Sequence, residues 1–151
     1  MLTEIEKSYL AGILDGEGSI QISEDSKSKY RRNCPRVSFM IIFDNTNLEL
    51  LKTLKKWLDD SRIYSKIGSY ERSEKTKIRH RLSIWRLADS LEFLSLIQPY
   101  VIVKKPQLQL ALEYLKSRVN KLNSPPRTKI LNSRERQIVK ELHKVNKKGR
   151  I

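Results

Sequence analysis

Residues 9–19 of the chain read YLAGILDGEGS. Upstream of this segment, the residues TEIE at positions 3–6 have the pattern of a capping box, in which Thr3 caps a helix and Glu6 reaches back to it. We therefore expect a helix from Glu4 to about Asp15, ended by the glycines that follow.

The middle of this helix, residues 9–14, is apolar on every side, which predicts contacts in more than one direction. Gly12 and Gly16 lie four residues apart on one face, and a face without side chains lets another helix backbone approach closely. The apolar run is too short to cross a bilayer, so we predict tight helix pairing in a soluble protein. The predicted contact residues are Tyr9, Leu10, Gly12, Ile13 and Gly16.

Glu17 follows the carboxyl end of the helix, where the helix dipole is already negative and a carboxylate is poorly placed for stability. If two such helices pair about a twofold axis, their two Glu17 side chains meet at the same pole. That arrangement calls for a cation, and Mg²⁺ held by carboxylate and backbone oxygens with water is the one we expect. On spacing alone, a helix with a glycine turn and a surface glutamate is the simpler interpretation and stays open.

Residues 10–18, LAGILDGEG, resemble the nine-residue signature of the LAGLIDADG homing endonucleases. They share its ordered apolar run, its two acidic positions and its glycines, with Glu17 at the last acidic position and Leu14 replacing another apolar residue. The chain contains one copy of the signature. The resemblance therefore implies the single-motif branch of the family, whose members act as homodimers.

The composition favours a polyanionic partner. The 151 residues include 31 Lys+Arg against 17 Asp+Glu, which gives a net charge of +14 and indicates nucleic acid or an anionic membrane surface. No long apolar segment or secretion signal is present, so we expect an intracellular protein without a membrane partner, located wherever the host DNA resides, in a prokaryotic cytoplasm or an organelle.

The rarest residue types exclude several classes of site. Cys34 is the only cysteine, which excludes an internal disulfide and a cysteine zinc site. The only histidines are His80, on the apolar side of a predicted strand, and His143, in a basic segment. Neither supports a histidine-based metal or nucleophile site, which argues against Ser/His hydrolases and most zinc enzymes.

The remaining pattern predicts an α/β (α+β) fold in the order helix, two strands, helix, two strands, helix, with the strands in one antiparallel sheet of four. We expect strands at 19–23, 36–43, 62–72 and 77–86, and helices at 48–58, 88–97 and 106–121. Residues 1–122 then form the core, 123–132 a linker, and 133–151 a basic C-terminal segment. That segment is either a helix from Ser133 to about Lys144, docked lightly on the body, or a disordered tail.

One face of the predicted sheet is polar and basic. A β-ribbon fits the DNA major groove, where Arg and Gln read base edges, and the resemblance implies a saddle over that groove. Any half-buried antiparallel sheet is polar outside, so the hypothesis depends on the excess of Lys and Arg over the whole set. The predicted DNA-contacting residues are Gln21, Ser23, Lys27, Lys29, Arg31, Arg32, Arg36, Ser38, Met40, Lys66, Tyr70, Arg72, Lys77, Arg79 and Arg81.

Two further positions match the family. Asn45 lies where the family has a polar Gln or Asn that orders active-site water, and Lys104 lies where many members have a lysine near the scissile phosphate. A plain helix cap at Asn45 and a solvated lysine at Lys104 remain open, and Lys105 is the alternative if the register differs by one. Where some relatives carry an arginine early in the second helix, this chain has Glu49.

The resemblance implies an intron- or intein-type homing endonuclease that binds a long, near-palindromic double-stranded DNA site as a homodimer and cuts both strands across the minor groove. In this scheme Glu17 and the Gly16 carbonyl oxygen bind Mg²⁺, for which Mn²⁺ or Ca²⁺ can substitute in binding. The metal activates water, while Asn45 places the water and Lys104 stabilises charge on the phosphate.

Two alternatives remain open, an RNA-binding maturase that helps an intron RNA fold and a DNA-binding regulator without cleavage. The intact acidic Glu17 argues against the regulator.

Overall fold

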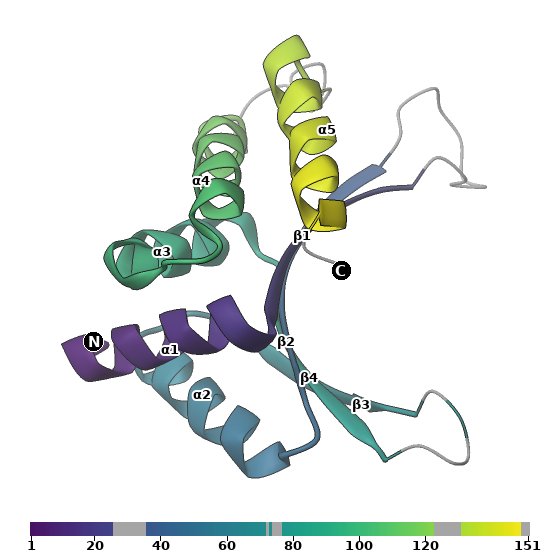
Figure 1. Ribbon diagram of the computed structural model, residues 1–151. Coiled ribbons are helices and arrows are strands. Elements are labelled where there is room, and N and C mark those ends of the chain that lie inside the picture. Colours follow the sequence, from purple (N-terminus) through teal and green to yellow (C-terminus); the bar gives the residue numbers. More distant parts are fainter. Residues whose placement is uncertain (26–35, 72, 74–76, 123–130, 149–151) are drawn as a thin grey trace.

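A computed structural model of the chain describes residues 1–25, 36–71, 73, 77–122 and 131–148. Four strands form one antiparallel sheet in the order β1-β2-β4-β3, so the predicted mixed α/β fold is confirmed (Figure 1). The elements are α1 (Glu4–Glu17), β1 (Gly18–Asp25), β2 (Arg36–Asn45), α2 (Leu48–Asp60), β3 (Lys66–Tyr70), β4 (Arg79–Ile84), α3 (Leu87–Ile97), the 3-10 turn η1 (Gln98–Tyr100), α4 (Lys105–Val119) and α5 (Ser133–Lys148).

Helix α1 begins as predicted and ends later than predicted. Thr3 and Glu6 form the capping box, with the Glu6 N–H donating to Thr3 Oγ1 and the Thr3 N–H to Glu6 Oε2. The helix runs to Glu17, and Gly18 closes it by donating its N–H to the carbonyls of Ile13 and Leu14. Gly18 has extended backbone, so it does not end the helix through a left-handed conformation. A Cβ at Gly18 would lie 2.7 Å from the Leu14 Cα, so glycine is required there by close packing.

The sheet has an apolar face, which packs against helices, and a polar face on the opposite side. Ile20 and Ile22 on β1 and Phe39 and Ile41 on β2 are buried against the helices, as the alternating sequence predicts. Helices α1 to α4 all lie on that side of the sheet, and none of the described helices covers the opposite face (Figure 1). Ile42 is the exception in the pattern, because it is buried although its neighbours in register face outward.

The strands of the second hairpin are shorter than predicted. Strand β3 begins at Lys66 because the chain first turns through Arg62, which has a positive φ of 61°. Strand β4 begins at Arg79, and Ile78, which lies within the predicted strand 77–86, precedes the observed strand and is exposed. Both errors arise because β-forming residues continue into the connecting segments.

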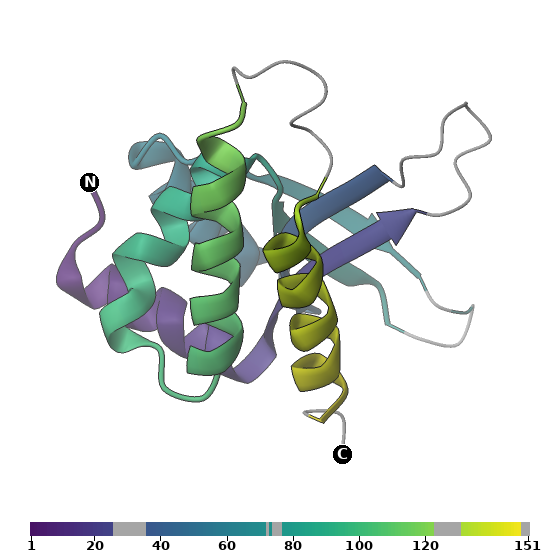
Figure 2. The same cartoon turned by 90° about the horizontal axis from the view of Figure 1, so that it is seen from above.

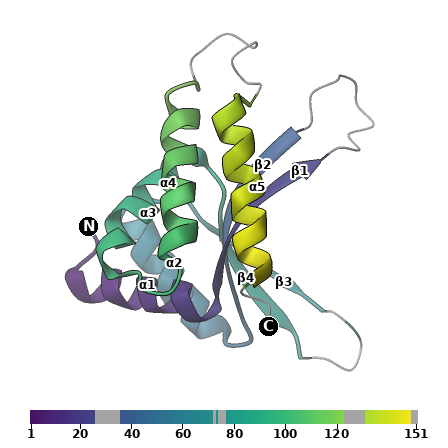
Figure 3. The same cartoon turned by 45° about the horizontal axis from the view of Figure 1, so that its top comes forward.

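Helix α5 is packed against the body. It lies beside α4 and beside β1, and the three views agree on this placement (Figures 2 and 3). Ile138, Val139 and Leu142 are buried within the same hydrophobic core as the other helices. The described part of the basic C-terminal segment is thus a helix four residues longer than expected, and residues 123–130 of the predicted linker lie outside the described residues.

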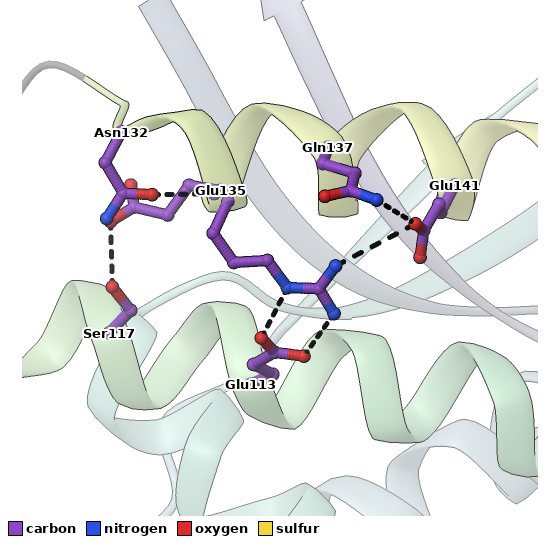
Figure 4. A network of polar contacts seen from close by, with 7 residues as sticks. Glu113, Ser117, Asn132, Glu135, Gln137 and Glu141 are labelled. Atoms are coloured by element: carbon purple, nitrogen blue, oxygen red, sulfur yellow. Dashed lines mark hydrogen bonds and ion pairs between the residues drawn. The ribbon is translucent and has the colours of Figure 1, made fainter.

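A buried carboxylate fixes the start of α5 on α4 (Figure 4). Glu135 is 1% exposed and accepts hydrogen bonds from Ser117 Oγ (2.8 Å), Asn132 Nδ2 (3.0 Å), Arg118 Nη1 (3.2 Å) and the Lys121 ammonium. Burial raises the pKa of this carboxyl, but the donors that surround it outweigh burial and hold the net pKa below its usual value. Arg134 adds a bidentate pair with Glu113 on α4.

The far end of α5 contacts the edge of the sheet. His143 Nε2 donates to the carbonyl of Ile22 (2.6 Å), and Asn146 Nδ2 donates to the carbonyl of Ile20 (2.9 Å). Both acceptors belong to β1, which has a strand neighbour on only one side in the described sheet. These contacts satisfy backbone groups that an edge strand leaves unpaired. None of the described helices is long and apolar enough to span a lipid bilayer.

Candidate active site

Glu17 and Asn45 meet at the carboxyl end of α1. Glu17 is the last, exposed residue of the helix, and Asn45 is the last residue of β2. Asn45 Nδ2 donates to Glu17 Oε2 (2.5 Å), while its Oδ1 accepts the N–H of Asn47 (2.7 Å). The cap of α2 is Asn47, whose Oδ1 accepts the N–H of Leu50. Asn45 is therefore not the helix cap, and its amide orients the glutamate carboxylate.

Lys104 lies on the other side of the same helix end. It is the N-cap residue of α4, and its Nζ donates to the carbonyl oxygen of Asp15 (2.7 Å), one of the carbonyls left unpaired at the end of α1. Burial lowers the pKa of the Lys104 ammonium, and the nearby Asp15 charge opposes this only in part. Residues from α1, β2 and the start of α4 that are far apart in sequence thus converge on one place.

Asp15 organises this junction, and our sequence analysis gave it no role. Its carboxylate accepts three backbone N–H groups, those of Ile102 (2.8 Å), Val103 (3.1 Å) and Lys104 (2.9 Å). Burial raises the Asp15 pKa, but these three donors and the Lys104 charge bring the net pKa below its usual value. Its position as the first acidic residue of the LAGILDGEG segment was the one available signal.

The oxygen atoms at this end of α1 are suitable ligands for a hard cation. Glu17 offers an exposed carboxylate, and the helix end offers backbone carbonyls, which are oxygen ligands of the kind Mg²⁺ and Ca²⁺ take. Within the described ranges, no group of three or more His, Cys, Asp or Glu side chains is placed to hold a metal.

The two sides of α1 differ in what covers them. Leu10, Ala11 and Leu14 are fully buried within the chain, so the prediction that Leu10 contacts a second helix is incompatible with its position in the core. Tyr9 is 46% exposed and Ile5 is 82% exposed. A Cβ at Gly12 or Gly16 would meet no atom within 4 Å, so this face of the helix is open in the single chain. Ile13 lies between the two sides and is half-buried.

The outward face of the sheet carries many of the predicted DNA-contacting residues. Exposed or half-buried positions with the outward alternation are Gln21, Ser23, Ser38, Met40, Lys66, Tyr70, Arg79 and Arg81. Lys77 is exposed but precedes β4. Lys27, Lys29, Arg31, Arg32 and Arg72 lie outside the described residues, as does the side chain of Arg36.

Arg81 is not a free side chain. It forms a bidentate ion pair with Asp44, its partner in register on β2, through Nε to Oδ1 (2.8 Å) and Nη2 to Oδ2 (2.9 Å). Burial raises the pKa of Asp44, but Arg81 outweighs it and the net pKa is lowered, while the same bond raises the pKa of Arg81. The Arg81 guanidinium also lies 5.0 Å from the centre of the Tyr70 ring.

His80 has a local partner, as expected for a histidine on the apolar side of its strand. Its Nδ1 lies 2.8 Å from the Oγ of Ser69, its neighbour across the β3–β4 pair. The side chain is half-buried.

Comparisons with known proteins agree with this architecture. A family model described as LAGLIDADG endonuclease matches residues 10–102. No curated protein sequence matches the chain significantly. Among solved structures, an archaeal intron-encoded homing endonuclease, I-Vdi141I, complexed with DNA, superposes with a TM-score of 0.69 at 20% identity, over 93% of this chain and 84% of that one.

Two further structures extend the comparison. The homing endonuclease I-CvuI, in complex with the I-CreI target in the presence of Mg, has a TM-score of 0.61 at 19% identity, over 93% of this chain and 96% of that one. I-SmaMI bound to an uncleaved DNA target in the presence of calcium ions has a TM-score of 0.70 at 18% identity, over 95% of this chain but 46% of that one. At these identities the likeness establishes a shared fold.

Proposed function

The chain belongs to the LAGLIDADG endonuclease family, a family of DNA nucleases, and from that premise we propose that it is a site-specific homing endonuclease. In this proposal it binds a long, near-palindromic duplex as a homodimer and hydrolyses one phosphodiester in each strand. The proposal includes the intron- or intein-encoded origin that the family resemblance implies.

The observation that carries the proposal is the convergence of Glu17, Asn45 and Lys104 at one end of α1. Asn45 holds the carboxylate of Glu17, and Lys104 is held against the neighbouring carbonyl of the helix. These residues provide an anionic oxygen donor, an amide that orients it, and a cation at the same end of α1. Each kind of group can contribute to metal-assisted hydrolysis of a phosphodiester.

The homodimer is supported by the uncovered face of α1. Tyr9, Gly12 and Gly16 lie on that face, and none of the described residues has an atom within 4 Å of a Cβ added at either glycine. An apolar, glycine-lined helix face that the chain leaves open is suited to close pairing with a second copy of itself. The superposition of this chain on less than half of the longer I-SmaMI chain is consistent with two copies forming one working unit.

The metal requirement is supported by the chemistry of the donors. In a twofold pair, the Glu17 carboxylates of both chains approach each other, and the Gly16 carbonyl oxygens add neutral ligands. A divalent ion bound there would lower the pKa of a water molecule and stabilise the leaving oxygen. Asn45 would orient that water through its contact with Glu17, and Lys104 would stabilise negative charge on the phosphate. Mg²⁺ is the proposed ion, with Mn²⁺ or Ca²⁺ as substitutes in binding. The I-CvuI structure is described as being in the presence of Mg, and the I-SmaMI structure as being in the presence of calcium ions.

The experiment is cleavage of a plasmid that carries the gene's flanking DNA with the insertion removed. We expect linear product with Mg²⁺ and none with EDTA. Glu17→Gln should reduce cutting by at least about 100-fold while duplex binding changes little. The glutamine amide keeps the shape of the glutamate side chain but not its charge. Glu92→Gln, at an exposed position on α3, is the matched control and should cut normally. Cutting by Glu17→Gln, or cutting in EDTA, would contradict the proposal.

The same preparation tests the maturase alternative. Tight binding to the folded intron RNA that Glu17→Gln leaves unchanged, with no cutting of the duplex, would favour an RNA-folding role over the nuclease.

A further inference from the structure

The Asp44–Arg81 ion pair lies on the outward face of the sheet, between β2 and β4. We propose that this pair is a fixed reader of one G·C base pair in each half of the DNA site, in which Asp44 positions Arg81 and also contacts the cytosine. The inference rests on the proposed function and goes beyond it, because it assigns a role to Asp44 and a base pair to Arg81.

Asp44 does not use the end-on edge of the Arg81 guanidinium. An arginine has five N–H donors, and Asp44 takes the Nε–H and one Nη2–H of Arg81 from the side. The two Nη1–H groups and the second Nη2–H remain. These donors form the end-on fork that matches the O6 and N7 acceptors of guanine.

The neighbours of Arg81 restrict its motion while leaving space in front of it. The Tyr70 ring lies 5.0 Å from the guanidinium carbon. Gly68 is opposite Arg81 on β3, and a Cβ there would meet nothing within 4 Å, so position 68 adds no side chain beside that of Tyr70 on the same strand. A guanidinium held in advance loses less conformational entropy when it binds.

The charge of the pair argues for a base pair and against a phosphate. Asp44 is the only acidic residue among the outward-facing strand residues whose side chains the structure describes. Its charge would repel a phosphate bound to Arg81 at short range. The Asp44 carboxylate accepts two bonds from Arg81 and also interacts with the Tyr70 side chain. A carboxylate has about four lone-pair sites, so Asp44 can still accept from the N4 amino group of cytosine. Together the two side chains complement the major-groove edge of a G·C pair.

A purely stabilising role does not explain the position of the pair. Its side chains are 40% exposed at Arg81 and 27% exposed at Asp44. Ion pairs at such exposure contribute little to folding stability. The pair also removes net positive charge from the middle of a basic surface, which costs non-specific DNA affinity. Specific reading of a base pair accounts for that cost.

The test is selection of binding sites from a randomised duplex DNA library by the full-length chain, followed by sequencing. The wild-type protein should enrich a fixed G·C pair in each half-site. Arg81→Ala should reduce the preference at that pair by about 5- to 150-fold, the range for one bidentate contact. Asp44→Ala should reduce preference at the same pair while leaving affinity for random duplex unchanged or raised. The double variant should lose less selectivity than the sum of the two single losses.

Two further variants separate a loss of base reading from a loss of side-chain shape and from a general effect of breaking an ion pair. Asp44→Asn preserves the side-chain shape and should still lower selectivity at this pair, with folding checked by thermal unfolding. Arg134→Ala breaks a bidentate arginine pair away from the sheet, with Glu113 between α4 and α5, and should leave the selected site unchanged.

The inference fails if Arg81→Ala weakens binding to all duplexes equally, or if Asp44→Ala keeps full selectivity. A wild-type protein that binds no duplex would overturn the proposed function together with this inference.

Discussion

Residues that are close in sequence at the end of α1 have different structural roles. Gly18 is required by packing, Glu17 is exposed and held by Asn45, and Asp15 faces inward onto the backbone of residues 102–104. The sequence pattern identified Glu17 because its position past a helix is unfavourable. Asp15 could not be assigned from the pattern, because its three partners lie 87 to 89 positions further along the chain.

Asp15→Asn tests this organising role. An amide retains one acceptor oxygen and loses the charge that three N–H donors share, so we expect the free energy of unfolding to fall by about 1 to 3 kcal/mol. Because Asp15 fixes the backbone of Lys104, cleavage activity should fall as well. Urea unfolding and a cleavage assay measure the two effects. Equal stability of Asp15→Asn and the control Glu92→Gln would show that the three bonds contribute nothing.

The contact between Asp44 and Arg81 could not be predicted from the sequence either. The alternation of the sequence predicted that Arg81 lies on the outward face of the sheet, and Arg81 lies there in the structure. The pairing with Asp44 depends on the register of β2 against β4, and a shift of one residue would place them on opposite faces. Alternation within one strand contains no information about that register.

Secondary-structure elements were predicted better in kind and order than in extent. The capping box and apolar stripes located the helices because these signals are local. The ends of β3 and β4 were wrong because strand length is decided by pairing with the neighbouring strand, as the paired range Lys66–Tyr70 illustrates. The firm attachment of α5 was not predicted, since the partners of Glu135 are on another helix.

Gly12→Leu tests α1 as a pairing element. The chain itself leaves room for the larger side chain, because a Cβ at Gly12 meets nothing within 4 Å, so the monomer should fold normally. In a close helix pair the same side chain would separate the backbones. Sedimentation should therefore show a shift from dimer to monomer. Thr53→Leu, on the exposed side of α2, is the matched control and should remain dimeric; an unchanged Gly12→Leu dimer would mean that the chains pair elsewhere.

Glu135→Gln tests the attachment of α5. The substitution leaves the Arg118 and Lys121 cations without their buried carboxylate, and we expect a loss of about 2 to 3 kcal/mol at pH 7. The folded pKa of Glu135 is lowered, so the ionised group stabilises the protein above its unfolded pKa of about 4.3, and this stabilisation is lost as the pH falls through the folded pKa.

The difference between Glu135→Gln and wild type, measured by urea unfolding, should therefore shrink below about pH 4. Glu113→Gln, which alters an exposed carboxylate on the same helix pair, should have a much smaller effect at every pH. A pH-independent difference at Glu135 would contradict the assignment.

The whole molecule combines a net charge of +14 with a sheet face that none of the described helices covers. Composition alone left nucleic acid and anionic membranes as partners, and the fold favours the first because it provides an uncovered sheet with basic side chains. If six to ten phosphates are neutralised, duplex affinity should fall by about 10³- to 10⁵-fold between 50 and 200 mM salt. Fluorescence anisotropy with a labelled duplex measures this, and affinity that is insensitive to salt would contradict the electrostatic interpretation.

The contact between α5 and β1 has a consequence for how the protein is made. His143 and Ile22 are 121 positions apart, so the ribosome releases the edge of β1 long before it synthesises the side chains that cover it. Throughout that interval the nascent chain exposes a strand edge that can recruit strands from other chains. Premature termination upstream of α5 would leave this edge permanently open. Helix α5, which is 16 residues long, therefore protects the first strand against pairing with other chains.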